Sequence, residues 1–260
     1  MEYRNLLVED HGAIRRITLN RPDKLNALDH ATLTELHAAF GAAGRDAAVR
    51  VVVLTGAGPK AFVAGADIAE MNGLSPAQAR DFSAHGQALM TRIERLGKPV
   101  VARINGFALG GGLELAMACH LRIAADHAKV GQPEINLGLV PGFGGTQRLL
   151  RLAGRAACLE LCLLGAPIDA ARAAALGIVT KVVPAESLDA EVDAIAGQLA
   201  ASAPLALRGI LDAVLLGGEA PLDTGLDHET QVFAVTFSTD DMKEGTSAFL
   251  SRRKPQFSGR

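Results

Sequence analysis

The sequence has no tryptophan, one tyrosine and only three cysteines among its 260 residues. With so few aromatic side chains, a surface on which nucleic-acid bases stack is not indicated. A sparse, odd set of cysteines is typical of a reducing compartment and does not suggest a disulfide framework. The formal net charge of −2 provides no basic field that would attract nucleic acid or anionic lipid. We therefore expect no nucleic-acid partner.

Long apolar runs are also missing, although 49% of the residues are hydrophobic. No stretch reaches the roughly 18 residues that a membrane-spanning helix needs. The first residues, from Met1 to Asn5, lack the basic-then-apolar profile of a secretory signal. We therefore expect a cytoplasmic protein with no membrane partner. The chain is long enough to bury one large core, with or without a helical appendage.

Short apolar runs alternate with segments of helical spacing up to about residue 200. Alternating apolar and polar residues predict a half-exposed strand at residues 14–20, and Asp29 is expected to cap the helix that follows. Continuous β-branched and aliphatic runs predict buried strands at residues 51–55, 99–104, 121–125 and 178–183. Strands that alternate with helices in this way predict an α/β fold with buried strands.

Beyond Ser202 the pattern becomes almost entirely helical. We expect residues 1–202 to form an α/β core and residues 203–260 to form a separate C-terminal helical region. Helices are predicted at residues 203–216, 222–237 and 240–250. Their apolar residues include Leu222, Leu226, Val232, Phe233, Val235 and Phe237. A region this apolar must be buried against the core, a neighbouring subunit, or both.

The segment from Asn105 to Ala116 contains three consecutive glycines, Gly110 to Gly112, followed closely by Glu114. It follows a predicted strand and begins a short apolar helix at residues 113–119. Glycines leave the N–H groups at a helix start open to a ligand, which favours a site for an oxyanion. Tight strand-to-helix packing, with Glu114 stabilising the helix dipole, is the alternative interpretation.

A second group of backbone donors is indicated at residues 60–68, where small residues again follow a predicted strand. Small side chains allow the main chain to approach a ligand closely. By itself this segment is a common type of connector. Together with the glycine triplet, it supplies the second donor that an oxyanion hole requires.

Glu134 directly follows Pro133 in an otherwise apolar segment. Removal from water raises the proton affinity of a carboxylate, which suits acid–base chemistry. A helix cap or an ion-pair partner is the alternative interpretation of such a carboxylate. The sequence has no nucleophile elbow, phosphate-binding loop or common zinc motif, and its Asp126-His127 pair is expected to lie on the surface. No metal site is therefore expected.

Taken together and in order, these segments resemble the crotonase (enoyl-CoA hydratase/isomerase) superfamily. The matching segments are Arg21 to Leu28, Phe62 to Ile68, Gly106 to Glu114, Gly131 to Glu134, Pro141 to Leu149 and Thr239 to Phe249. The resemblance covers essentially the whole chain. It implies a spiral of β-β-α turns, followed by C-terminal helices that build homotrimers, which are commonly paired into homohexamers.

The resemblance also implies an acyl-CoA substrate, with Glu114 and Glu134 as the paired acid–base residues of the hydratase branch. The backbone N–H groups of Ala66 and Gly111 would bind the thioester oxygen. Further contacts with the substrate or its CoA are implied for Lys24, Leu25, Ala27, Ala64, Asp67, Ile68 and Gly142. The implied activity is that of a hydro-lyase, the reversible addition of water to a 2-enoyl-CoA, as in fatty-acid β-oxidation. CoA is part of the substrate, and no cofactor is expected.

Two positions depart from the usual pattern of the family. Ala69 stands where hydratases often carry lysine. Phe143 stands where a smaller residue is frequent, and its larger side chain predicts a reshaped acyl pocket. Arg252, Arg253 and Lys254 either reach CoA phosphates across a subunit boundary or form the solvated end of a terminal helix.

The nearest alternative function is an enoyl-CoA isomerase or another acyl-CoA lyase of the same superfamily, with a differently placed acid or a single glutamate. Some members of the superfamily bind RNA, which the lack of a basic stripe disfavours. Retention of both glutamates and both donor segments argues against a non-catalytic scaffold. The sequence leaves open the acyl chain length, the pathway, the physiological direction, and the choice between trimer and hexamer.

Overall fold

The computed structural model describes residues 3–260, so the prediction about the N-terminus falls partly on residues 1–2, outside the described range. The body of the molecule is built on a six-stranded sheet, in which β1 and β2 are antiparallel and the remaining neighbours are parallel. Its strands, in spatial order, are β1 (Leu6–His11), β2 (Ile14–Leu19), β3 (Val51–Gly56), β5 (Val100–Ile104), β7 (Leu121–Ala125) and β10 (Lys181–Val183).

A second sheet is made of four very short strands. They are β4 (Ala61–Val63), β6 (Phe107–Leu109), β8 (Lys129–Gly131) and β9 (Ile168–Asp169), also in spatial order. The chain passes from β3 to β4, from β5 to β6 and from β7 to β8, and a helix follows each pair. This repeat of two strands and a helix is the predicted spiral of β-β-α turns, and the α/β fold class is confirmed.

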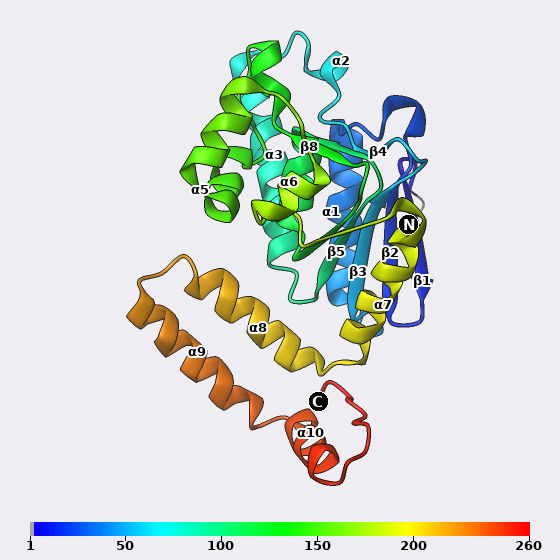
Figure 1. Cartoon of the computed structure of the whole chain (residues 1–260), viewed down its shortest axis with the longest axis vertical. Coiled ribbons are helices and arrows are strands. Elements are labelled where there is room, and N and C mark those ends of the chain that lie inside the picture. The colour runs from blue at the N-terminus through cyan, green and yellow to red at the C-terminus, as the bar shows by residue number, and fades with distance from the viewer. Residues whose placement is uncertain (1–2) are drawn as a thin grey trace.

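Helices cover both faces of the large sheet (Figure 1). The helices of this part of the chain are α1 (His30–Arg45), α2 (Ile68–Met71), α3 (Pro76–Glu94), α4 (Gly111–Ala118), α5 (Gly145–Leu164), α6 (Ala170–Ala175) and α7 (Leu188–Ala201), with 3-10 turns η1 (Pro22–Lys24), η2 (Pro133–Leu137) and η3 (Ala185–Ser187). Of these, α1 packs on one face of the large sheet and α7 on the other. In β3, Val52 and Leu54 face the main core, whereas Val51 and Val53 face the cluster beneath α7. Burial on both faces explains why this strand has a continuous apolar sequence.

Most of the predicted elements are present. Asp29 caps α1 by accepting a hydrogen bond from the Thr32 N–H at 2.7 Å, as expected. The strand predicted at residues 178–183 was too long, because only Lys181–Val183 is extended. Gly177, with φ of 75°, ends the preceding helical segment, and the N–H groups of residues 178 and 179 both bond to the Ala173 carbonyl.

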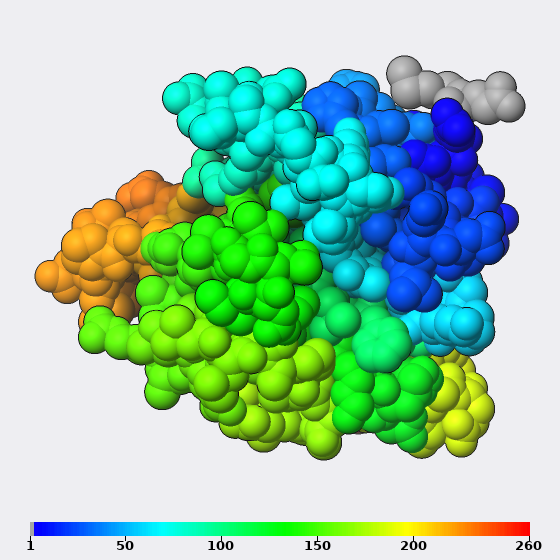
Figure 2. Space-filling view, turned by 90° about the horizontal axis from the view of Figure 1, so that it is seen from above, coloured from blue at the N-terminus to red at the C-terminus, as the bar shows by residue number. Residues whose placement is uncertain are grey.

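The C-terminal helices α8 (Pro204–Gly217), α9 (Leu222–Thr236) and α10 (Asp240–Leu250) lie apart from the sheets (Figure 1). α8 and α9 pack against each other as a hairpin, and α9 projects beyond the core in the view of Figure 2. Several large apolar side chains are exposed on these helices, including Ile210, Val214, Leu222, Phe233, Val235, Phe249 and Leu250. The helices match the predicted ones, and their apolar surface is uncovered in the single chain.

Across residues 3–260, no single helix is both long and apolar enough to cross a membrane. The helical stretches Ala185–Ala201 and Pro204–Gly217 meet the length and composition criteria only as a pair, with a bend of 106° between them.

Candidate active site

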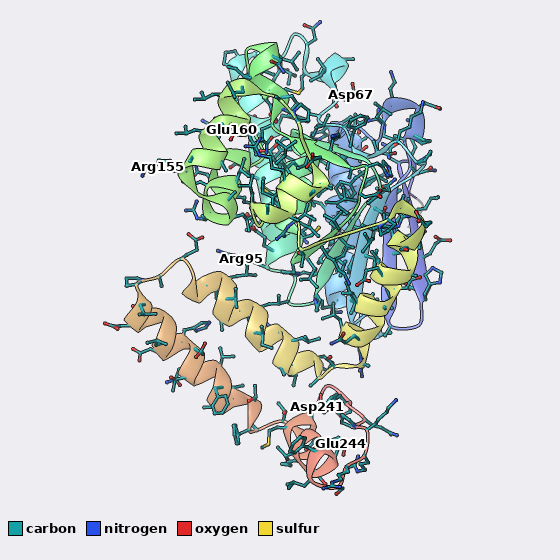
Figure 3. The ribbon with its side chains drawn as sticks, in the orientation of Figure 1. Asp67, Arg95, Arg155, Glu160, Asp241 and Glu244 are labelled. Carbon is teal, nitrogen blue, oxygen red and sulfur yellow. The ribbon has the colours of Figure 1, made fainter. Side chains whose placement is uncertain are left out.

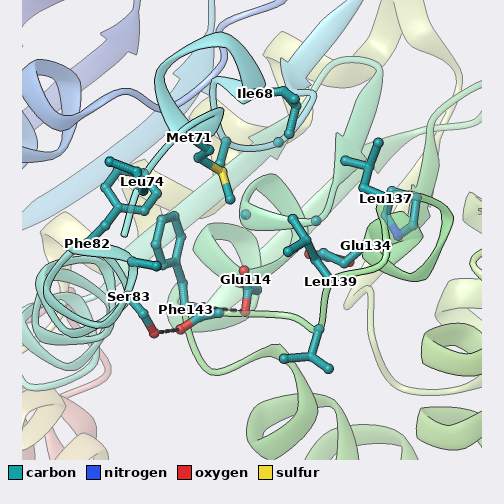
Figure 4. Close-up of a pocket in the computed structure, with 18 of the residues that line it drawn as sticks. Ile68, Met71, Leu74, Phe82, Ser83, Glu114, Glu134, Leu137, Leu139 and Phe143 are labelled. Atoms are coloured by element: carbon teal, nitrogen blue, oxygen red, sulfur yellow. Dashed lines mark hydrogen bonds between the residues drawn. The ribbon is translucent and has the colours of Figure 1, made fainter. Parts of the chain in front are cut away.

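A cavity of about 670 Å³ opens beside the start of α4 and contains both predicted glutamates (Figure 4). One wall is formed by α2, α3 and the segment between them, and the other by η2 and the segment that leads into α5. In Figure 2 these two walls are the neighbouring cyan and green surfaces. The lining of the cavity is mostly apolar, with few polar groups, which is typical of a small-molecule site.

Glu114 lies in the first turn of α4 and is 1% exposed. Every residue of this helix is buried, and Gly112 passes so close to the Val63 carbonyl of β4 that a side chain there would overlap it. The Glu114 carboxylate oxygen Oε1 accepts hydrogen bonds from the backbone N–H groups of Phe143, at 2.7 Å, and Gly145, at 2.6 Å. These two donors fix the direction in which the carboxylate faces.

Burial raises the pKa of Glu114 to about 7 from an ordinary value of 4.5. The negative charge of Glu134 raises this pKa further, whereas the N–H groups of Gly145 and Phe143 and the positive charge of Arg148 oppose the rise. A carboxyl group with a pKa near neutrality exchanges protons readily at physiological pH, as an acid–base catalyst must.

Glu134 lies in the first turn of η2, with its side chain turned into the same cavity (Figure 4). Burial raises its pKa as well. With its amide nitrogen directed at Glu134, the fully buried Gln132 donates to both carboxylate oxygens, at 3.0 and 3.1 Å. Gly110 has φ of 51°, and a side chain there would lie 2.8 Å from the Glu134 Oε1 atom. Glycine at this position therefore lets Glu134 approach the start of α4.

The two residues predicted to supply backbone donors, Ala66 and Gly111, lie close together. Gly111 is the first residue of α4, where an N–H group has no acceptor within the helix. Ala66 forms a parallel bridge with Leu28. In this bridge the Leu28 N–H donates to the Gly65 carbonyl, and the Leu28 carbonyl accepts from the Asp67 N–H. The Ala66 N–H is therefore left out of this bridge, and it lies 3.4 Å from the position of a β-carbon on Gly111. Both residues line the cavity beside Glu114.

The other predicted contact residues fall into two groups. Ala64, Ile68 and Gly142 line the cavity. Lys24, Leu25, Ala27 and Asp67 do not; they lie in or beside the turn that supports the Ala64–Ala66 backbone, where the Leu25 carbonyl accepts from the Ala64 N–H at 3.1 Å. Their predicted contacts with CoA stay predictions.

Asp67 is occupied by partners within the protein. Its Oδ1 atom accepts from the Ala69 N–H at the start of α2, and its Oδ2 atom is 3.0 Å from Arg21 Nη2. Although burial raises the pKa of Asp67, the Arg21 guanidinium brings it below its ordinary value. Asp67 thus ties the segment that carries Ala66 to Arg21 and to the start of α2.

The wall formed by Met71, Leu74, Phe82 and Ser83 was not predicted from the sequence. The capping box of Ser75 and Gln78 at the start of α3 was available as a signal for that helix. Nothing local to these residues reveals that they face a cavity, because their position depends on how α3 packs across α4.

The basic residues near the C-terminus lie outside the cavity of their own chain. Arg253 pairs with Glu244 at 2.6 Å, and Glu244 lies on α10, away from the main body (Figure 3). The two alternatives for Arg252, Arg253 and Lys254, contact with CoA across a subunit boundary and the solvated end of a terminal helix, both stay open. Asp126 and His127 are exposed, as expected. Among residues 3–260, no group of three or more His, Cys, Asp or Glu side chains is arranged to hold a metal ion.

Comparisons with known proteins agree with this geometry. The enoyl-CoA hydratase/isomerase family model matches residues 9–260. The chain is 46% identical over 257 residues to the crotonyl-CoA hydratase of Syntrophomonas wolfei, covering 99% of each chain. It is 43% identical over 254 residues to the short-chain-enoyl-CoA hydratase of Clostridium acetobutylicum, covering 98% of this chain and 97% of that one. A crystal structure of an enoyl-CoA hydratase from Bacillus anthracis superposes with a TM-score of 0.96 at 40% identity, covering 99% of this chain and 100% of that one.

The fold and the site define a crotonase-type enzyme with two acidic side chains and two backbone donors in one cavity. The chain belongs to the enoyl-CoA hydratase/isomerase family and, within it, to the enoyl-CoA hydratase branch. The predicted family and the predicted hydro-lyase function are confirmed.

Proposed function

We propose that this chain adds water reversibly across the double bond of a short 2-enoyl-CoA, with Glu114 and Glu134 as the acid–base pair. The observation that carries the proposal is the position of both carboxyl groups in one cavity, beside the N–H groups of Ala66 and Gly111. Both carboxyl groups have raised pKa values, so a proton can reside on the pair near neutral pH.

The two backbone N–H groups bind the thioester oxygen. When the oxygen of water attacks the β-carbon, the π electrons move towards the carbonyl, and negative charge develops on this oxygen. Donors that are already in place stabilise that charge without reorganisation, and losing one such donor typically costs about 10²–10³ in rate. Because Gly111 begins α4, the positive end of the helix dipole faces the same oxygen.

The glutamates move the protons. One carboxylate accepts a proton from water as the C–O bond forms at the β-carbon, and the protonated partner delivers a proton to the α-carbon. The two steps together add one water molecule and leave the total charge of the pair unchanged. No electrons are gained or lost overall, so the reaction calls for no redox cofactor. Each contribution is worth roughly 10²–10⁴ in rate.

Phe143 lines the cavity with a bulky ring, which favours a short acyl chain. Its ring packs against Phe82, with ring centroids 5.2 Å apart, and it fills a notch on α3 that exists because residue 86 is glycine. The ring also lies 3.3 Å from the position of a β-carbon on Gly111, beside the donors for the thioester oxygen. The relatives named for crotonyl-CoA and short-chain substrates support the same substrate class.

A series of 2-enoyl-CoA substrates of increasing chain length tests this proposal. We expect the highest kcat/KM for the four-carbon substrate, with a steep fall as the chain lengthens. Phe143→Ala keeps the backbone N–H that serves Glu114 but opens the cavity, so it should shift the preference towards longer chains. Phe143→Leu should give a smaller shift in the same direction if the alanine variant is poorly folded. Phe107→Ala, on an exposed aromatic residue outside the cavity lining, is the control.

An unchanged chain-length profile in both Phe143 variants would refute the proposed role of this ring. Conversion of a 3-enoyl-CoA to its 2-enoyl isomer at a higher rate than hydration would instead favour the isomerase alternative.

We further propose that residues 1–202 form the catalytic core and residues 203–260 the oligomerisation region of a cytoplasmic homotrimer or homohexamer. The exposed apolar side chains of α8, α9 and α10 support this assembly, because a surface of this kind is rarely left in contact with water.

A further inference from the structure

The peptide groups between Gly142 and Gly145 link α3 to the catalytic carboxylate. The Gly142 carbonyl accepts hydrogen bonds from Ser83 Oγ at 2.5 Å and from Gln87 Nε2 at 3.0 Å. The N–H of the same peptide unit belongs to Phe143 and donates to Glu114 (Figure 4). A small rotation of this peptide would therefore weaken the bonds on both sides.

Arg148 holds the next peptide group in this segment. Its Nη1 atom donates to the Phe143 carbonyl at 3.0 Å. Its Nε and Nη2 atoms donate to the two oxygens of Glu94, at 2.7 and 2.8 Å. Arg148 lies in the first turn of α5, and Glu94 is the last residue of α3. The guanidinium therefore uses three N–H donors at once, in a geometry that only arginine provides.

The pair is largely shielded from water, because the side chains of Arg148 and Glu94 are 16% and 26% exposed. Gly144 has φ of 101°, and a β-carbon at this position would collide with Arg148 Nη1. The guanidinium thus lies directly against the segment that serves Glu114. Shielded, bidentate pairs are stronger and better defined than exposed ones.

We propose that the Arg148–Glu94 ion pair is a positioning unit for Glu114, which holds the Phe143 and Gly145 N–H groups on the Glu114 Oε1 atom. This inference rests on the proposed role of Glu114 in catalysis. Neither residue lines the cavity, so the pair acts through the backbone and not by touching the substrate. The positive charge of Arg148 also lowers the pKa of Glu114, so its loss would raise that pKa.

The experiment compares Arg148→Met, Arg148→Lys and Glu94→Gln with the wild-type enzyme. Arg148→Met should lower kcat by about 10²-fold with little change in KM, because misplacement of a catalytic group by about 1 Å has that effect. The apparent upper pKa of kcat/KM should move to higher pH. Arg148→Lys keeps the charge but cannot reach all three acceptors, so it should recover part of the activity. Glu94→Gln should give an intermediate loss.

Arg172→Met is the matched control. Arg172 forms an ion pair with Glu160 of α5, in which its Nη2 atom donates to both carboxylate oxygens, at 2.7 and 2.8 Å, but it does not contact the Gly142–Gly145 segment. Glu160 is labelled on α5 in Figure 3, and its side chain bonds to Arg172 of α6. Removal of this pair should leave kcat and the pH profile unchanged, which separates loss of an ion pair in general from loss of this one.

Infrared titration of the carboxyl bands supplies a readout other than activity. The difference between wild type and Glu114→Gln identifies the Glu114 band, and the midpoint of that band should rise in Arg148→Met. A folded Arg148→Met variant with reduced thermal stability but an unchanged kcat and an unchanged midpoint would overturn the proposal, leaving the pair as a structural bridge between α3 and α5. If Arg148→Met does not fold, the kcat values of the other two variants decide: a lowered kcat in both supports the positioning role, and wild-type kcat in both overturns it. Full activity of Glu114→Gln would instead refute the proposed function.

Discussion

The raised pKa of Glu114 predicts that ionisation of this buried carboxyl group lowers the stability of the folded enzyme. The pKa is about 7 in the folded chain and 4.5 when unperturbed. A group whose folded pKa is raised contributes stability below the unfolded pKa and loses it as the pH rises through the folded pKa. The difference between a pKa of 4.5 and one of about 7 corresponds to about 3 kcal/mol in the free energy of unfolding. This stabilisation is lost as the pH rises from about 4.5 to about 7.

Glu114→Gln tests this magnitude. The glutamine amide resembles the protonated carboxyl group in shape and still presents an oxygen to the Phe143 and Gly145 N–H groups. The variant should therefore be more stable than wild type by up to about 3 kcal/mol at pH 8, but by less than about 1 kcal/mol at pH 5. For a chain of this size, each kcal/mol corresponds to roughly 2–4 °C in Tm.

Thermal unfolding of both proteins from pH 5 to pH 8, at one fixed protein concentration, measures the difference. Fixing the concentration matters because dissociation of an oligomer also changes Tm. Glu160→Gln, at a partly exposed residue on α5, should show no comparable rise with pH. The quantity to compare is the stability of Glu114→Gln minus that of wild type at each pH. If this difference were no larger at pH 8 than at pH 5, the argument that burial raises the pKa of Glu114 would be refuted.

Three further outcomes follow from the same structure. Glu134→Gln should lower kcat by two or more orders of magnitude with a small change in KM, as steady-state kinetics will show, and near-wild-type kcat would remove Glu134 from the mechanism. Gly111→Val should abolish turnover in a folded oligomer, because its side chain would meet the Phe143 ring and the Ala66 N–H; an active variant, or one that fails by unfolding, would leave the oxyanion role unsupported. Light scattering should give a mass near three or six times 27.0 kDa. Truncation after Ser202 should give insoluble or dissociated, inactive protein. A fully active monomer would contradict the assembly.

The parts of the fold that the sequence predicted are those governed by local pattern. The strands β2, β3, β5 and β7 carry either alternating or continuous apolar residues, and the cap of α1 is a single aspartate four positions before Leu33. The strands of the second sheet could not be predicted in this way, because three residues are too few to show a period. They are extended only because the spiral stacks them side by side.

The same distinction between local pattern and tertiary packing holds for the residues of the site. The glycines at residues 110–112 signalled backbone donors, and Pro133 with its apolar surroundings signalled a buried carboxylate at Glu134. That Glu114 and Glu134 share a cavity depends on the stacking of β6 and β8, and only the combined motifs of the family pointed to it. The Arg148–Glu94 pair spans 54 positions, and no periodicity or spacing joins its two members.

Hydration of crotonyl-CoA in isotopically labelled water tests the central claim most directly. The reaction is run in D₂O enriched in ¹⁸O, and the product is analysed by mass spectrometry and NMR. The account predicts a 3-hydroxyacyl-CoA with one ¹⁸O at the β-carbon and one deuterium at the α-carbon. It also predicts that Glu114→Gln and Glu134→Gln each slow the appearance of both labels together. Formation of a product without ¹⁸O, such as a 3-enoyl isomer, or incorporation at the wild-type rate in both variants, would contradict it.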